Sequence, residues 1–159
     1  MITYKKKNDE FPQIDDLDRK ILRIITKNAR TPFLEVARDC GVSGAAIHQR
    51  VQRLVALGVV SGSEFILDPE KLGYNSCSYM GLILEKGKHL DAVYKRLLDI
   101  PEVVECHFMT GQYSMYIKIL AQNNAHLKHI IDMIGEIDEV SRTETSISLQ
   151  KAFQRQIPV

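Results

Sequence analysis

The sequence predicts an α+β fold: an N-terminal three-helix helix-turn-helix domain, joined by an extended linker to a C-terminal ferredoxin-like βαββαβ domain. Apolar residues recur with helical spacing in the first sixty residues, and the second half alternates strand and helix patterns in the order β-α-β-β-α-β. Charge divides as well. Residues 1–62 hold eleven Lys and Arg against seven Asp and Glu, and residues 63–159 hold ten against thirteen. The basic half is therefore the candidate for contact with a polyanion.

These patterns divide the chain into five expected segments. They are a disordered or extended tail over 1–13 that contains Lys5-Lys6-Lys7, a helix-turn-helix over 14–60, a linker strand and turn over 61–73, a βαββαβ domain over 74–150, and a tail over 151–159.

Composition argues against several classes of protein. Apolar residues make up 45% and charged residues 26%, as in globular proteins, and no run of 18 apolar residues could span a membrane. The start lacks the apolar run of a signal peptide, so we expect a cytoplasmic protein. No phosphate-binding loop or catalytic motif predicts an enzyme or a cofactor.

No metal site is predicted either. Cys40, Cys77 and Cys106 lack metal-ligand spacing, and we interpret all three as small buried apolar residues. His126 and His129 fall on the polar side of a predicted helix with no third ligand nearby, which favours a solvated pair.

The first two helices follow from caps and apolar spacing. Asp15 can cap the first helix, which presents an apolar stripe. The stripe is formed by Leu17, Ile21, Ile24 and Ile25. Thr31 is the predicted cap of a second helix over 33–40, with Pro32 at its first position.

A third helix is predicted over 43–57, with Ser43 as its cap and Gly58 at its end. Small Ala37, Gly41 in the turn and apolar Ile47 have the spacing of a helix-turn-helix, although an ordinary helical hairpin shares this pattern.

One face of the third helix has the character of a DNA-reading surface. Ile47, Val51 and Leu54 point inward, and no carboxylate occurs from 43 to 58, where phosphate would repel it. Gln49 can pair with adenine and Ala45 can contact a thymine methyl group. The predicted DNA-binding residues are Ser43, Ala45, His48, Gln49, Arg50, Gln52 and Arg53, with the two arginines on phosphates. The alternative is that the arginines belong to an ordinary solvated face.

The second half predicts strands over 76–84, 103–109, 113–120 and 140–149, with helices after the first and third. Helices can cover only one face of such a sheet. Tyr79 and Ile83, with Tyr116 and Leu120, place apolar side chains on the other face, and such a face usually marks an association surface. We therefore predict a homodimer, which would also place two recognition helices on paired half-sites.

Residues 14–150 resemble the Lrp/AsnC family of feast/famine transcription regulators. The motifs that carry the resemblance are Leu17-Asp18-x-x-Ile21-Leu22, Val36-Ala37-x-x-x-Gly41-Val42-Ser43, Arg50-Val51-x-Arg53-Leu54-x-x-x-Gly58-Val59-Val60, Asp68-Pro69-x-x-Leu72-Gly73, and Val104-Glu105-Cys106-His107-Phe108-Met109-Thr110-Gly111. The resemblance implies a plain or winged helix-turn-helix that binds promoter DNA, and a sheet domain that dimerises and builds rings, commonly octamers. It also implies an amino acid or a related small molecule as effector.

The resemblance implies that this effector binds between dimers, beside the hairpin turn. That turn commonly contains two acidic positions, and here it is Gly111-Gln112-Tyr113-Ser114, with Gln112 and Ser114 neutral. The predicted effector-binding residues are Gly111, Gln112, Tyr113, Ser114, His107, Thr143 and Thr145. The missing carboxylates leave two outcomes open, an altered ligand or none.

Three functions are therefore compatible with the sequence. The first is a sequence-specific regulator of transcription that binds double-stranded DNA and responds to a small molecule. The second is an architectural DNA binder without an effector. The third is a small-molecule-binding βαββαβ protein whose helical half mediates contacts.

Overall fold

The computed structural model describes residues 11–85 and 89–159 and divides into two units. We call the first the helical unit; its described residues are 11–66 and 153–159. We call the second the sheet unit; its described residues are 67–85 and 89–152. The expected disorder of the N-terminal tail concerns mainly residues 1–10, including Lys5-Lys6-Lys7, which lie outside the described residues.

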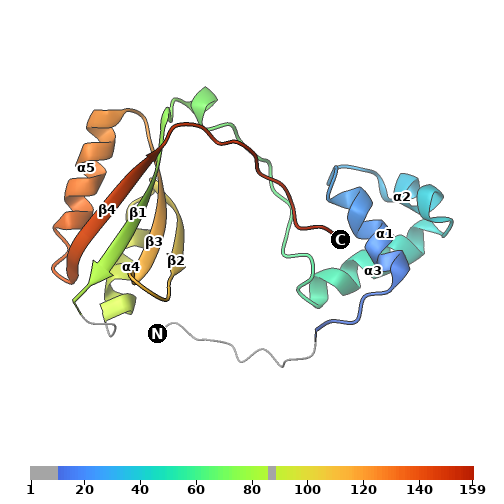
Figure 1. Cartoon of the computed structure of the whole chain (residues 1–159). Helices are drawn as coiled ribbons and strands as arrows, with labels where there is room; N and C mark the ends of the chain where they lie inside the picture. The colour runs from blue at the N-terminus through green and yellow to red at the C-terminus, as the bar shows by residue number, and fades with distance from the viewer. Residues whose placement is uncertain (1–10, 86–88) are drawn as a thin grey trace. The chain divides into compact units, whose positions relative to one another are not determined.

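The helical unit contains α1 (Asp16–Ile25), α2 (Phe33–Cys40) and α3 (Gly44–Ala56), drawn in Figure 1. Asp15 caps α1, and Ser43 caps α3 by accepting a hydrogen bond from the Ala46 N–H, both as predicted. Gly41 ends α2 with a φ of +71°, a left-handed conformation that glycine adopts without strain.

The predicted cap of α2 is wrong. Pro32 occupies the cap position, and no side chain caps this helix. Thr31 instead donates its hydroxyl to the carbonyl of Asn28 at 2.8 Å, within the turn that follows α1. As an N-cap, the Thr31 hydroxyl oxygen would instead accept a hydrogen bond from a backbone N–H in the first turn of α2.

The three helices enclose a small core. Ile21, Val36, Ala37 and Ile47 are buried together, with Val51 packed against them. Because Ile47 and Leu54 are fully buried, the opposite side of α3 faces outward.

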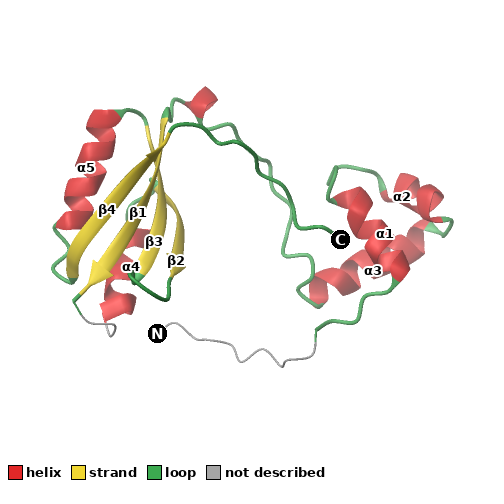
Figure 2. Ribbon diagram, in the orientation of Figure 1, coloured by secondary structure: helices red, strands yellow, loops and turns green. Residues whose placement is uncertain are grey.

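The sheet unit begins with the short 3₁₀ helix Glu70–Leu72, and its main elements alternate as predicted. These are β1 (Ser76–Leu84), α4 (Leu90–Leu98), β2 (Val103–Phe108), β3 (Met115–Ala121), α5 (Asn124–Gly135) and β4 (Val140–Ser148). The strands form one antiparallel sheet in the order β2-β3-β1-β4, shown in yellow in Figure 2, and this confirms the predicted fold class. The expected linker strand is not formed, because residues 61–67 pair with no described strand.

One face of the sheet packs against α4 and α5. Met80 and Leu82 of β1 and Met115, Ile117 and Ile119 of β3 are buried there with the apolar side chains of both helices. Alternate residues of each strand point to the other side, which we call the open face. The cysteines were expected to be buried, but all three are only partly buried, and each carries a free thiol.

Candidate nucleic-acid interface and ligand site

The outward side of α3 is the first candidate site. Six of the predicted DNA-binding residues are exposed on it: Ser43, Ala45, His48, Gln49, Gln52 and Arg53. The Ser43 hydroxyl oxygen is already engaged as the helix cap, which leaves its O–H free to donate. The His48 ring lies edge-on to Phe33 of α2, with 5.9 Å between centroids. The two short helices thus present adjoining side chains at one surface.

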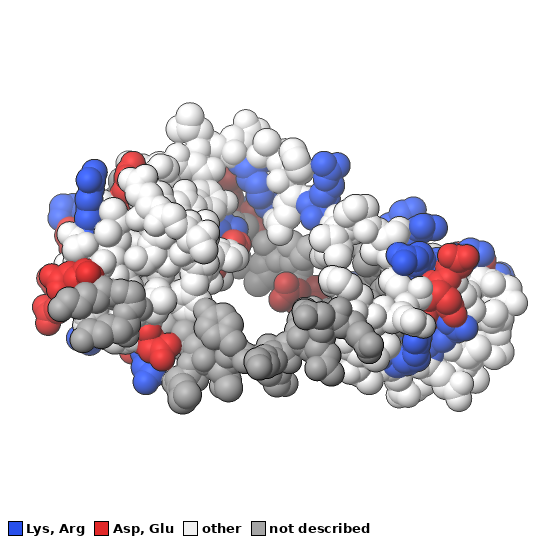
Figure 3. Space-filling view, turned by 60° about the horizontal axis from the view of Figure 1, so that its bottom comes forward, with Lys and Arg blue, Asp and Glu red and all other residues white. Residues whose placement is uncertain are grey.

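Arg50 and Arg53 are not free, and this changes the expectation that both bind phosphate. Nη1 of Arg50 donates to Oδ2 of Asp15 at 2.7 Å and to Oδ1 of Asp18 at 2.8 Å. Arg53 donates through Nη1 to Oδ2 of Asp18 at 3.0 Å and through Nη2 to the carbonyl of Gln13 at 2.8 Å. On the face seen in Figure 3, the helical unit shows basic side chains on both sides of a small acidic group.

Asp18 links the start of α1 to the middle of α3. Its side chain is fully buried, and it also accepts from the N–H of Asp15 at 3.2 Å, while Asp15 accepts from the N–H of Asp18 at 2.8 Å. The N–H of Asp18 and then Arg50 lower the pKa of Asp15, and both carboxylates raise the pKa of Arg50. Two carboxylates therefore offset two guanidinium groups, which makes the cluster nearly neutral.

A surface hollow of about 360 Å³ adjoins this cluster. It is lined by Asp15, Gln49, Arg50 and Arg53. Gln49 thus connects the hollow to the exposed side of α3.

The open face of the sheet is the second candidate site. The strand register places His107, Tyr116, Gly81 and Glu144 in one row across β2, β3, β1 and β4. In the adjacent row, Tyr79 stacks on Tyr116, with 6.2 Å between ring centroids.

Charged groups share this face. Lys118 is opposite Tyr79 and binds Glu105 at 2.7 Å, and this contact raises the pKa of Lys118. The face is therefore aromatic and charged, whereas the sequence pattern had indicated a bare apolar surface.

Tyr113 of the hairpin turn lies over β1. A Cβ atom on Gly81 would come within 2.5–2.7 Å of its ring, so only glycine leaves room for the ring there. The phenol donates to Oε2 of Glu144 at 2.8 Å, and this bond raises the pKa of Tyr113. Glu144 thus supplies a carboxylate beside a turn whose own residues, Gln112 and Ser114, are neutral.

The other residues predicted for the effector divide between the two faces. Thr143 and Thr145 are opposite Leu82 and Met80, so they lie on the helix-covered face, away from Tyr113. His107 is exposed on the open face, with 3.9 Å between its Nε2 and Oε2 of Glu105.

The turn itself has a defined backbone. Gly111 has a φ of +109°, and Ser114 donates its N–H to the carbonyl of Leu82 at 2.8 Å. Gln112 is exposed. The structure therefore brings together His107 and Tyr113 on the open face but not the two threonines.

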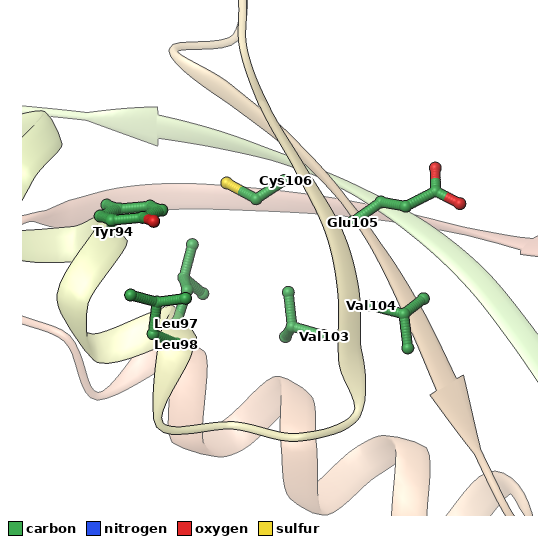
Figure 4. A pocket seen from close by; sticks show the side chains of 7 residues that line it. All are labelled: Tyr94, Leu97, Leu98, Val103, Val104, Glu105 and Cys106. Atoms are coloured by element: carbon green, nitrogen blue, oxygen red, sulfur yellow. The ribbon is translucent and has the colours of Figure 1, made fainter. Parts of the chain in front are cut away.

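A groove of about 220 Å³, lined mainly by apolar side chains together with Glu105, lies between α4 and β2 (Figure 4). Cys106 points toward Tyr94, whereas Glu105 points to the other side of the strand (Figure 4). Burial raises the pKa of the Cys106 thiol, so the group stays protonated and is a poor nucleophile.

Sequence reasoning missed Asp18 and Glu144. Asp18 was visible as an acidic residue in a first helical turn, but its two arginine partners lie more than thirty residues away. Glu144 had no local signal, because only the pairing of β4 with β1 brings it to Tyr113.

Two further properties concern the described residues alone. They contain no helix long and apolar enough to cross a membrane, and no cluster of three His, Cys, Asp or Glu arranged to hold a metal ion. His126 lies 3.3 Å from Glu102, and His129 is exposed.

Comparison with known proteins identifies both units. Residues 14–55 match the AsnC-type helix-turn-helix domain, and residues 78–158 match the Lrp/AsnC ligand-binding domain. The chain is 43% identical over 145 residues to regulatory protein AsnC of Haemophilus influenzae, covering 91% of this chain and 97% of the relative. It is 35% identical over 137 residues to the HTH-type transcriptional regulator FL11 of Pyrococcus furiosus, covering 86% and 90%.

Solved structures agree with these matches. The structure of Escherichia coli AsnC superposes with a TM-score of 0.88 at 37% identity, covering 93% of this chain and all of the other. A transcriptional regulator of Neisseria meningitidis, solved as a complex with L-Met, shares the fold with a TM-score of 0.84 at 19% identity, covering 90% and 94%. An AsnC-type helix-turn-helix and a Lrp/AsnC ligand-binding domain thus occur in one chain, which belongs to the Lrp/AsnC family of DNA-binding transcription regulators.

Proposed function

We propose that the chain reads duplex DNA with the exposed side of α3, through Ser43, Ala45, His48, Gln49 and Gln52. One observation carries this proposal: these side chains are exposed together on a helix that contains no carboxylate. Arg50 and Arg53 contribute by holding α3 against α1, and Arg50 also lines the hollow beside Gln49. Base contacts then set specificity, and phosphate contacts set register.

The test is binding to a duplex from upstream of the protein's own coding region, compared with a scrambled duplex of equal length. About six phosphate contacts per dimer would give a slope of log affinity against log salt near −5. Gln49→Ala should cost about 1–3 kcal/mol on the preferred duplex and little on the scrambled one. The matched control is Gln122→Ala, an exposed glutamine of the sheet unit. Equal losses on both duplexes would remove Gln49 from base reading, and no binding at low salt would refute DNA binding by this chain.

We infer that the working form is a homodimer joined through the open face. Support comes from the stacked Tyr79 and Tyr116 on a face that neither α4 nor α5 covers. A two-fold dimer would carry two copies of α3 to paired half-sites. Octameric rings built from such dimers are the further assembly that the family suggests.

We also infer that a small molecule related to an amino acid binds beside the hairpin turn. The Glu144 carboxylate, held by Tyr113, offers a partner for an α-ammonium group, and a distant structural relative was solved with L-Met. A panel of amino acids screened by thermal shift should give one ligand that raises the melting temperature. Glu144→Gln should abolish that rise, and Glu136→Gln, a change at an exposed site next to α5, should preserve it.

An architectural DNA binder without an effector is the second candidate. The neutral Gln112 and Ser114 favour it, because neither offers a negative charge to an ammonium group. This candidate would be supported if no amino acid in the thermal-shift panel raised the melting temperature while the protein still bound duplex DNA. Either role requires duplex DNA as partner and no catalytic group, and we expect it to be carried out in the cytoplasm.

A further inference from the structure

Arg50 is hydrogen-bonded through only part of its guanidinium group. The group has five N–H donors, and the contacts to Asp15 and Asp18 both use Nη1. Within residues 11–85 and 89–159, no hydrogen bond from Nε or Nη2 of Arg50 is formed. The arginine therefore keeps donors for an anion arriving from outside.

Its two carboxylate partners differ in accessibility. Asp18 is fully buried and accepts from Arg50, Arg53 and the backbone of Asp15, so an external anion cannot replace it. The Asp15 side chain is 54% exposed and lies in the lining of the hollow beside Arg50. An external anion that approaches Arg50 would therefore compete with Asp15, the accessible one of its two carboxylate partners.

A backbone phosphate is an anion of suitable chemistry. Phosphate oxygens accept charge-assisted hydrogen bonds from guanidinium as carboxylates do. Gln49 lines the hollow and also lies on the exposed side of α3, so DNA read by Gln49 brings its backbone close to this place.

We propose that Asp15 lowers the affinity of the protein for DNA by holding Arg50 in the free state, in competition with a backbone phosphate that enters the hollow. This inference rests on the proposed DNA binding by α3. Asp15 then weakens phosphate contacts generally, while the base-reading residues keep their preference. The pairing of Asp15 with Arg50 therefore reduces the affinity for non-specific DNA.

Asp15→Asn tests the competition without removing the helix cap, because asparagine caps as well as aspartate does. The control is Asp16→Asn, which makes the same charge change at an exposed residue of the same helical turn. Asp15→Asn should tighten binding to the scrambled duplex about tenfold, as expected for one charge-assisted hydrogen bond regained by phosphate. The log–log salt slope should steepen by about 0.9 for each added phosphate contact. Asp16→Asn should leave the slope unchanged.

Two further variants make the result decisive. Asp15→Ser, another strong cap, should repeat the gain, and Arg50→Ala should abolish it in the Asp15→Asn background. The proposal is overturned if neither Asp15 variant binds more tightly than Asp16→Asn, or if the gain persists without Arg50. Failure of the unaltered protein to bind any duplex would instead refute the proposed function.

Discussion

At the scale of single residues, Asp18 carries a charge although it is fully buried, and two arginines of another helix compensate it. A buried ion pair contributes little when intact, but removing one partner leaves an uncompensated charge. Here the carboxylate is shared by Arg50, Arg53 and the capping box of α1. The Asp18 carboxylate therefore joins α1 to α3, in addition to the apolar packing of Ile21 against Ile47.

Asp18→Ala should destabilise the helical unit by about 3 kcal/mol, toward the low end for such pairs because both arginines are partly exposed. Hydrogen exchange in the full chain measures this, through faster exchange of α1 and α3 amides with unchanged exchange in the sheet. Asp16→Ala at an exposed position should stay within about 0.5 kcal/mol. Equal protection in the two variants would show that the buried cluster does not hold these helices together.

Gly81 is a second decisive residue, because the Tyr113 ring occupies the place of a side chain. Gly81→Ala should cost about 2 kcal/mol by overpacking and should separate Tyr113 from Glu144. Urea unfolding of the sheet unit, followed by tyrosine fluorescence, measures the loss. With Tyr113→Ala as background, the same substitution should cost much less. If the losses in unfolding free energy of the two single variants simply added in the double variant, the steric explanation would be wrong.

At the scale of elements, we expect the stability of the beginning of α1 to depend on pH in the acid range. The pKa of Asp15 lies below its ordinary value of 3.8, first because the N–H of Asp18 binds the carboxylate and then because Arg50 does. The charged carboxylate therefore stabilises the folded state fully above about pH 4. This contribution is lost as pH falls through the lower pKa of the folded state.

Thermal unfolding between about pH 5 and pH 2 should accordingly show a falling midpoint for the helical unit. Asp15→Asn should flatten this acid limb, because the amide does not titrate, and Asp16→Asn should flatten it less. Circular dichroism at 222 nm, with hydrogen exchange to assign the helices, provides the measurement. If the midpoint fell equally steeply with pH in all three proteins, the protonation of Asp15 would not contribute to the acid dependence of stability.

At the scale of the whole molecule, two units have different tasks. The helical unit carries the AsnC-type helix-turn-helix, and the sheet unit carries the ligand-binding domain of the family. The open face contains stacked tyrosines together with the Lys118–Glu105 pair. Such a mixture suits an interface whose apolar centre gives affinity and whose charges set register.

Tyr79→Glu should therefore break the proposed dimer. Each of two copies would bury a carboxylate whose cross-strand neighbour, Lys118, is already bound to Glu105, and this should raise the dissociation constant at least about a hundredfold. Sedimentation velocity over a range of concentrations measures the change. His129→Glu, at an exposed position of α5, is the matched control and should sediment as the unaltered protein does. A Tyr79→Glu variant that remains dimeric would place the interface elsewhere.

Periodicity and turn chemistry by themselves determined the order of elements, the caps at Asp15 and Ser43, and the inward side of α3, because these depend on residues within one or two turns. The exposure of Gln49 followed from the same spacing. Tertiary structure alone decided the partners of Arg50 and Arg53, the place of Tyr113 over Gly81, and the separation of Thr143 from the turn. Those contacts join residues far apart in sequence, and packing and strand register, which no local pattern contains, bring them together.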